Sequence, residues 1–560
     1  MDLIPPGWRT KLYRLISWAT PFLALVLIGL VYFLGVRTER TGFVREVLDP
    51  GLKRITNPVL NAFRGGVPPV HSLLIQLDSA AVDSMLEIEH SAKVRGWLGT
   101  SMNAYFVGSV EWGDSTLAAV ISLQEGPRIN DGKADLGQLQ VGLVMGDTIQ
   151  GMQRFNLKKI TNGQVLHGWL MAHVLAEQRL PVLGRSIVEA TTPWYKNGLS
   201  SLEGALDSTA LVRWGAENFI AGWYGNELYL AAQQETAELK YPVDPLRQAD
   251  WLVAPILTSL IAGTTKNAQT TKAQELVVRS LDAFRKGSRS TSEVFQVNAL
   301  AKLYALSDLF GQQRTMAWWN LRFVPDSTAR LMTVPLQYLE PGPIARIHAL
   351  TSGNVIRFPS NGSDLIDRMF NDPVFYRAYV AYLDTISTPG WSEALFERYA
   401  AELDLQERIV VGYFPQYVLD RAIFEHNRLV IRSTLYPKDL MLAYFEDRIG
   451  AVDRLAVGNV HALPVEVVAF VAENDTVELE KPIFIAAREP DMPLTYDMIR
   501  LEVSSATSSP SVLLVRPVGL HSTIAVHVGS WNTLSSTLLS DPFALDLPTN
   551  QTTSTKTRIT

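Results

Sequence analysis

The residues from 317 to 338 carry the side chains whose types and spacing could bind a metal ion. Their sequence, AWWNLRFVPDSTARLMTVPLQY, predicts two short strands joined by a turn at Pro325 and Asp326. Asn320 lies on the first strand, and its amide oxygen is a ligand type that Mg²⁺ accepts. The second strand ends at Gln337, which offers a neutral oxygen where a phosphotransferase needs a carboxylate. The spacing therefore predicts a metal-type hairpin with an incomplete set of ligands.

Other groups with catalytic spacing are few. The chain has no Gly-rich phosphate loop, no His-Glu-x-x-His zinc helix and no Gly-x-Ser-x-Gly elbow. His173 and Glu177 lie one turn apart on a predicted helix, and without a third ligand we interpret them as a hydrogen-bonded surface pair. His521 and His527, near the last strands, are interpreted as ordinary surface residues. A Ser-His-Asp triad stays an open alternative with no motif to support it.

Length and composition limit the class of protein. With 560 residues, of which 47% are hydrophobic and 19% charged, the chain is expected to form two to four globular domains. A formal net charge of -6 and the lack of a Lys/Arg block argue against a nucleic-acid-binding protein. The chain has no cysteine, which excludes disulfides, thiolate metal sites and cysteine nucleophiles, and fits an oxidising compartment.

One apolar segment bears on the location of the protein. Residues 15–36 (LISWATPFLALVLIGLVYFLGV) form an uncharged run of about 22 residues, enough for a helix to cross roughly 30 Å of hydrocarbon. Trp18 and Tyr32 lie near its ends, as interfacial aromatic residues do. The charges on its two sides barely favour either orientation. We predict an uncleaved single-pass membrane anchor, with the long remainder of the chain outside the cytoplasm and in contact with partner proteins of the cell envelope.

Changes in sequence pattern divide the rest of the chain. Alternating strand patterns dominate up to residue 241, helical patterns dominate from there to residue 462, and short strands separated by turn-rich linkers follow. The last of these regions is expected to be a small β-sandwich that folds by itself and has no catalytic role. The predicted parts are an anchor (1–36), a juxtamembrane helix and linker (37–70), a β-rich lobe (71–241), a helical lobe (242–462), a β-sandwich (463–546) and a disordered tail (547–560).

A series of segments between residues 73 and 463 occurs in an order and spacing that chance rarely produces. They are LLIQLDSAAVDSMLEIEHSAKVRGWL, STLAAVISLQEG, GDTIQGMQRFNL, SLEGALD, AFRKGSRSTSEVFQVNALAKLYALSDLFG, WWNLRFVPDSTARL, FNDPVFYRAYVAYL and VGNVHALPVEV. Together these segments resemble the CotH (spore coat protein H) kinase family, in particular its long membrane-anchored bacterial members. The resemblance implies an α+β, bilobal, protein-kinase-like fold that uses ATP and Mg²⁺.

The resemblance also implies roles for particular residues. Glu203 would orient the lysine that binds the phosphates, Asn320 would bind the metal, and Gln337 stands where the metal-binding aspartate is expected. The lysine itself is missing, because the strand before the Gly-Asp turn has Gln140, Gly142 and Val144 at the candidate positions. The segment GQQRTMAWW, where the catalytic acid is expected, contains no carboxylate.

Two functions follow as hypotheses. The first is a pseudokinase-type scaffold that keeps the kinase-like fold, has lost nucleotide chemistry and binds envelope proteins. The second is an active kinase, or another phosphoryl or nucleotidyl transferase, whose metal ligands have moved to Asp326 or Glu340. Whether the chain is an enzyme is left open at this point, with ATP and Mg²⁺ as the cofactors if it is active.

Overall fold

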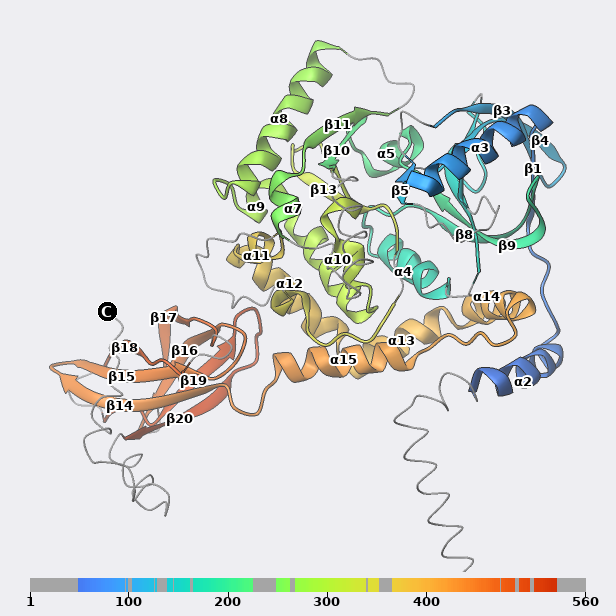
Figure 1. The fold of residues 1–560 in the computed structure, drawn as a ribbon. Coiled ribbons are helices and arrows are strands. Elements are labelled where there is room, and N and C mark those ends of the chain that lie inside the picture. Colours follow the sequence, from blue (N-terminus) through green and yellow to red (C-terminus); the bar gives the residue numbers. More distant parts are fainter. Residues whose placement is uncertain are drawn as a thin grey trace, which may run out of the picture. The chain divides into compact units, whose positions relative to one another are not determined.

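The structure is a computed structural model of the chain (Figure 1). It describes residues 49–95, 97–98, 103–124, 126–127, 138–144, 146–161, 165–224, 248–261, 267–338, 341–351, 365–473, 475–488, 493–503 and 508–530.

The first folded part is a closed barrel of seven strands. β1 pairs antiparallel with β3 and parallel with β8, and these two contacts close the barrel. Residues alternate between the two faces of each strand, so that in β6 Leu139 and Val141 are buried while Gln140 is half-buried. In barrel order the strands are β1 (Ser72–Gln76), β3 (Phe106–Trp112), β4 (Ser115–Leu123), β6 (Gln138–Leu143), β7 (Arg154–Lys159), β9 (Tyr195–Gly204) and β8 (Arg185–Thr192).

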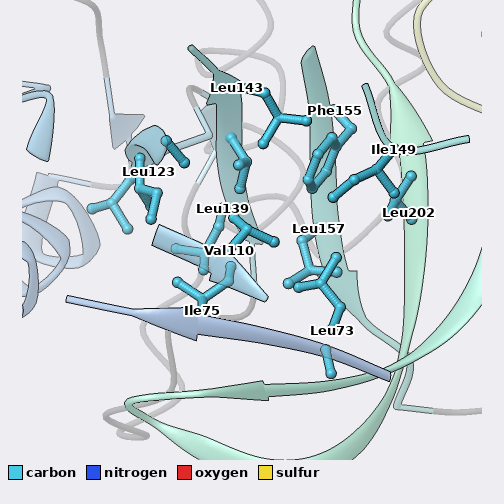
Figure 2. Packing of buried hydrophobic residues seen from close by; sticks show 14 of the residues in the cluster. Leu73, Ile75, Val110, Leu123, Leu139, Leu143, Ile149, Phe155, Leu157 and Leu202 are labelled. Carbon is cyan, nitrogen blue, oxygen red and sulfur yellow. The ribbon is translucent and has the colours of Figure 1, made fainter. Parts of the chain in front are cut away.

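Aliphatic side chains and Phe155 fill the interior of this barrel. Figure 2 shows residues from β1, β3, β4, β6, β7 and β9 gathered in one cluster. The helix α3 (Ser79–Arg95) adds Met85 and Ala92 to the same cluster. Burying one Leu, Val or Phe side chain contributes about 1.5–3 kcal/mol. The outward-facing residues of the strands are therefore free to carry polar groups without loss of the core.

Two helices and a second sheet follow the barrel strands in sequence. The helix α4 (Leu166–Glu177) buries most of its residues, and α5 (Ser208–Trp214) is capped by Asp207, whose Oδ1 accepts a 2.7 Å hydrogen bond from the Ala210 amide. The second sheet has the order β11-β10-β12-β13, with β10 (Phe219–Trp223), β11 (Ile256–Leu260), β12 (Leu321–Pro325) and β13 (Leu331–Pro335). β12 and β13 form a hairpin in which Leu321 pairs with Pro335 and Pro325 pairs with Leu331.

An aromatic core covers one face of this second sheet. Trp223 makes edge-to-face contacts with Trp251 and Phe323, at ring-centroid distances of 5.6 and 4.8 Å, and Phe284 and Phe295 extend the cluster. The helices that provide these rings and their neighbours are α7 (Gln248–Val253), α8 (Ala268–Arg285), α9 (Thr291–Val294) and α10 (Val297–Leu309). The hairpin is thus held rigidly at its back by packed aromatic rings.

Further helices follow the hairpin in sequence. They are α11 (Leu365–Phe370), α12 (Pro373–Ile386), α13 (Pro389–Arg398), α14 (Ala400–Tyr413) and α15 (Ala422–Leu435). The 3-10 turns η3 (Gln313–Met316), η4 (Trp318–Asn320) and η5 (His348–Leu350) lie in the connections that follow α10. Asn320 therefore lies at the end of a 3-10 turn that leads into β12, one residue before the strand on which it was expected.

The seven C-terminal strands are hydrogen bonded in one continuous order, and residues from both ends of that order share one core. β20 joins the two halves, because its first part pairs with β19 and its last residues pair with β14. β14 and β15, at residues 441–459, share the core of this sheet. The strands are β14 (Met441–Ile449), β15 (Val452–Asn459), β16 (Val465–Ala472), β17 (Asp475–Ile485), β18 (Asp497–Glu502), β19 (Val512–Pro517) and β20 (Ile524–Ser530).

The predicted fold class needs correction. The chain divides into two compact units, residues 1–70 with 161–164 and 402–419, and residues 71–160 with 165–401 and 420–560, which do not follow the two predicted lobes. The strands of the predicted β-rich lobe close into a barrel, which was not predicted, because the pairing of β1 with β8 joins residues more than 100 positions apart that local alternation does not connect. The boundaries proposed between domains stay predictions.

The predicted membrane anchor is also corrected. Residues 15–36 lie outside the described residues, and among the residues that the structure does describe no helix is long and apolar enough to cross a membrane. The longest described helices, α3 and α8, carry charged side chains along their length, whereas a spanning helix needs about 20 predominantly apolar residues. The anchor, and the extracytoplasmic location that depended on it, are therefore not carried further.

Candidate functional site

Asn320 lies at the base of the β12–β13 hairpin and is 1% exposed. Its Nδ2 donates hydrogen bonds to the carbonyl oxygens of Thr315 and Gln337, both at 2.8 Å. Its Oδ1 accepts a hydrogen bond from the backbone amide of Gln337 at 3.0 Å. Both amide hydrogens and the carbonyl oxygen of the side chain are thus used to fasten backbone to backbone. Asn320 acts as a structural bridge in the position where a metal ligand was predicted.

Gln337 meets Asn320 through its backbone. Its amide donates to Asn320 and its carbonyl accepts from Asn320, while its own half-buried side chain supplies no charge. A divalent cation at this point would find at most neutral oxygens, and Mg²⁺ in phosphotransfer sites is held by at least one carboxylate. The structure therefore brings Asn320 and Gln337 together, and their hydrogen bonds stabilise the base of the hairpin.

A buried cation lies beside Asn320. Arg322, on β12, is 7% exposed, and its Nη1 donates to the carbonyl oxygens of Trp319 and Leu321 at 3.0 and 2.9 Å. Its guanidinium lies 4.2 Å from the centre of the Tyr224 ring, and burial lowers the pKa of Arg322 from its usual value. The backbone carbonyls of the residues before and after Asn320 thus accept hydrogen bonds from a positively charged guanidinium.

Glu203 lies in the barrel on β9 and is paired with an arginine of the neighbouring strand. Its Oε1 accepts hydrogen bonds from Nη2 of Arg185 and from the Ser201 hydroxyl, the latter at 3.0 Å. The two charged side chains are 15% and 11% exposed. Glu203 was predicted to orient a phosphate-binding lysine, and in the structure it orients Arg185.

The Arg185–Glu203 pair adjoins the hairpin through Tyr338. The Arg185 guanidinium lies 5.7 Å from the centre of the Tyr338 ring, and Tyr338 directly follows Gln337. A Cβ placed on Gly168 of α4 would come within 2.3 Å of Nη1 of Arg185 and 3.2 Å of the Cβ of Tyr338, so only glycine permits this approach. Glu203, Asn320 and Gln337 therefore belong to one region of the molecule, linked by Arg185 and Tyr338.

The outward face of the barrel strands near Glu203 is polar. The strand registers place Gln140 opposite Asn156 and Asn156 opposite Glu203 in one row across β6, β7 and β9. Gly142 pairs with Arg154, whose Nε would lie 3.6 Å from a Cβ at Gly142. The missing lysine is therefore not replaced on β6 itself, but a cationic side chain from β7 crosses the same position.

Sequence reasoning overlooked the three arginines of this region, Arg154, Arg185 and Arg322. Alternation along the strand Arg154–Lys159 places Arg154 on the same face as Asn156, and the sequence pattern carries this signal. The position of Arg322, two residues after Asn320, could have been read from the same hairpin. No local signal places Arg185 beside Glu203, because that contact depends on the pairing of β8 with β9.

The relocated ligands of the active-enzyme hypothesis are not found among the described residues. Asp326 lies at the tip of the hairpin, where its Oδ1 accepts hydrogen bonds from the amides of Thr328 and Arg330 at 2.7 and 3.0 Å and its Oδ2 accepts from Gln296. This end of the hairpin is opposite to Asn320 in the strand register. Glu340 lies outside the described residues. In the described parts of the chain, no three His, Asp or Glu side chains come together as a metal site.

A buried polar network contains the residue types of a Ser-His-Asp triad. The Ser307 hydroxyl and Nε2 of His348 are hydrogen bonded at 2.8 Å, but Asp308 accepts from the backbone amide of His348, not from its ring. Tyr379 and Gln313 donate to the same carboxylate, and Ser307, Asp308 and His348 are 0% exposed. The order of bonds differs from that of a hydrolase triad. We interpret the network as part of the helical core.

The remaining histidines have structural roles. Nδ1 of His173 is bonded to the carbonyl of Trp169 at 2.8 Å, and Glu177 accepts from Arg398 and Tyr399. The expected pair between His173 and Glu177 is therefore absent, since each has other partners. His521 and His527 are exposed, as expected for surface residues.

Comparison with known proteins gives little further guidance. No known protein family and no curated protein matches the chain. A solved structure described as the Helicobacter pylori proinflammatory kinase CtkA is similar at 12% sequence identity, with a TM-score of 0.19, over 50% of this chain and 92% of that chain. The comparison thus reaches only a weak likeness to a kinase, on which we base no argument. Membership of the CotH family, and with it the use of ATP and Mg²⁺, stays a prediction.

Proposed function

We propose that this chain is a non-catalytic, pseudokinase-type scaffold whose ligands or partners bind without phosphate transfer. The observation that carries the proposal is the hydrogen bonding of the Asn320 side chain. Its three hydrogen bonds to backbone groups use both amide hydrogens and one lone pair of the oxygen that would have to bind the metal. The neighbouring Gln337 supplies no carboxylate that could take over this role.

The charge beside Asn320 supports the same conclusion. Arg322, two residues after Asn320, is nearly buried, and at low local dielectric a fixed positive charge opposes the binding of a divalent cation in the same region. Phosphoryl transfer needs metal ions to neutralise the developing negative charge on the phosphate. A site with a structural asparagine, a neutral glutamine and an arginine lacks that neutralisation by metal.

The sequence resemblance to the CotH family is the reason for describing the scaffold as pseudokinase-type. Its expected partners are other proteins. A location in the cell envelope is no longer part of the proposal, because it rested on the membrane anchor.

Labelled ATP tests the proposal directly. The full chain is incubated with γ-labelled ATP and Mg²⁺ or Mn²⁺, and both self-labelling and ATP hydrolysis are followed, with Asn320→Ala as the matched control. We expect the wild type and the variant to give the same background signal. Phosphate transfer that exceeds the background and disappears in Asn320→Ala would show that Asn320 has a catalytic role after all.

A further inference from the structure

Arg322 is a buried cation without a carboxylate partner among the described residues. Its side chain is 7% exposed, and its recorded contacts are two backbone carbonyls and Tyr224. An arginine taken out of water is costly unless an anion compensates its charge. Its burial on β12, two residues after Asn320, therefore calls for an explanation.

Two other buried carboxylates of the described chain provide a contrast. Glu466, 3% exposed, is paired with both Arg377 and Arg516, and Asp453, 0% exposed, is paired with Arg448 at 2.6 Å. Each of these ions has a partner of opposite sign. Arg322 has none among the described residues, although it is buried to a similar extent.

The hydrogen bonds that the described residues make to the Arg322 guanidinium come from backbone carbonyls and from Tyr224. Nη1 uses its two hydrogens on the carbonyls of Trp319 and Leu321. The centre of the Tyr224 ring lies 4.2 Å from the guanidinium carbon, and the Tyr224 side chain is also hydrogen bonded to Arg322. No carboxylate of the described residues bonds to the edge formed by Nε and Nη2, and this edge is the one that binds carboxylate and phosphate groups with two parallel hydrogen bonds.

A second arginine increases the positive charge nearby. Arg185 is paired with Glu203, yet its Nη1 is buried and has no hydrogen-bond partner among the described residues. Tyr338 links Arg185 to Gln337, and Gln337 is bonded to Asn320. Counting the ionisable groups already named in this region, Arg154, Arg185, Arg322 and Glu203, the net charge is two positive units (three arginines less one glutamate).

We propose that Arg322, with Tyr224 and the carbonyl groups that fix its guanidinium, forms a binding site for an oxyanion that needs no divalent metal. The ligand group is a phosphate or a carboxylate of a small molecule. The proposal rests on the proposed function in one respect, since it assigns to the same region a metal-free ligand instead of a nucleotide with Mg²⁺. In this arrangement the bound anion provides the negative charge that compensates the buried guanidinium of Arg322.

Thermal melting of the full chain at constant ionic strength tests the site. Inorganic phosphate and acetate are titrated against NaCl, once in EDTA and once in Mg²⁺. We expect at least one of the two anions to raise the melting temperature by about 2 °C or more in EDTA, with a saturating concentration dependence. The arm that responds distinguishes a phosphate ligand from a carboxylate ligand. Generic salt effects do not saturate and appear in every variant.

Variants identify the residue responsible. Arg322→Met is expected to lose the saturating response, while Arg279→Met, which removes an arginine that is 72% exposed on α8, is expected to keep it. Arg322→Lys retains the charge without the planar fork, and its affinity is expected to fall about tenfold. Should Arg322→Met fail to fold, this Lys variant and equilibrium dialysis of labelled phosphate or acetate on the wild type decide the question.

Three outcomes would overturn the inference. They are the lack of any saturating response in EDTA, an unchanged response in Arg322→Met, and an unchanged affinity in Arg322→Lys where the Met variant cannot be measured. A response that requires Mg²⁺ would reject the metal-free site and the proposed function together. If neither anion raises the melting temperature of the wild type, in EDTA or in Mg²⁺, the oxyanion site is rejected and the proposed function is unaffected.

Discussion

Asn320 and Arg322 are two positions apart, and both use backbone carbonyl groups as their partners. The amide of Asn320 matches its three backbone partners, whereas Arg322 brings a charge that those carbonyls only partly compensate. The first residue is therefore expected to matter for stability, and the second for ligand binding. The sequence pattern predicts that Asn320 lies in the hairpin and binds a metal ion. The second part is ambiguous from sequence, because a side-chain amide offers the same oxygen to a cation and to a backbone N–H.

Replacing Asn320 separates a structural role from a catalytic one. Asn320→Ala leaves two carbonyls and one amide at the hairpin base without partners, at a cost of about 1–3 kcal/mol for a buried group left unsatisfied. The melting temperature of the full chain is expected to drop by several degrees. Gln337→Ala is the matched control, because Gln337 takes part through its backbone and should lose little. An equal loss in both variants would contradict the assignment.

Asp308 and His348 predict opposing effects of pH on stability. Burial raises the pKa of Asp308 from 3.8 to about 7, so the unfolded chain loses this proton first and stability falls as the pH rises from about 4 to 7. Burial lowers the pKa of His348 from 6.5 to about 3, so stability falls as the pH drops from about 6.5 to 3. Between about pH 4 and 6.5 the two dependences oppose each other.

Single variants should separate these two dependences. Asp308→Asn removes the first, so its melting temperature is expected to fall more steeply than that of the wild type as the pH is lowered below 6.5. His348→Gln removes the second and should become more stable relative to neutral pH as the pH is lowered. The measurement is the melting temperature from pH 4 to 8 in buffers of equal ionic strength. Parallel curves for all three proteins would refute the burial of these groups.

At the level of elements, alternation of side chains predicted most strands of the barrel and both strands of the hairpin. It failed where packing decides the local structure. Within the region of predicted helical pattern, β11 occupies Ile256–Leu260 because these residues pair with β10. The helical segment that begins at Thr291 is interrupted at Phe295, which adopts an extended conformation and bridges to Leu331. Such contacts between distant segments leave no local signature.

The approach of α4 to the barrel depends on a glycine. Gly168 lies in a helix, where alanine is usually more stable by about 1 kcal/mol, but a Cβ there would meet Nη1 of Arg185 at 2.3 Å. Gly168→Ala is therefore expected to lower the melting temperature and to disturb the Arg185–Glu203 pair. Gly390→Ala on α13, where a Cβ would meet nothing within 4 Å, is the control and should be neutral or stabilising. Equal stabilisation in both variants would mean that Arg185 moves aside freely.

At the scale of the whole molecule, the C-terminal sheet is the part whose extent the sequence misjudged. The sequence pattern predicts strands from residue 463 on, whereas β14 and β15 lie within the region 242–462 that is predicted to be helical. Both strands share one core with the later ones, including Leu455 and Val467. The sheet also contacts α12, through the Arg377–Glu466 pair and through Gly519, where a Cβ would come within 2.8 Å of Val380.

Truncation at two positions tests where this sheet begins. Deleting residues 465–560 removes β16 to β20, five of the seven strands, and leaves β14 and β15 with the apolar face of their shared core in water. We expect this product to aggregate, since an isolated two-stranded hairpin is only marginally stable. Deleting residues 437–560 removes the whole sheet, and its contacts with α12 are few. This shorter product is expected to stay soluble and to melt within a few degrees of the full chain. A soluble, cooperatively melting 1–464 fragment would instead place the boundary at residue 463, as the sequence alone predicts.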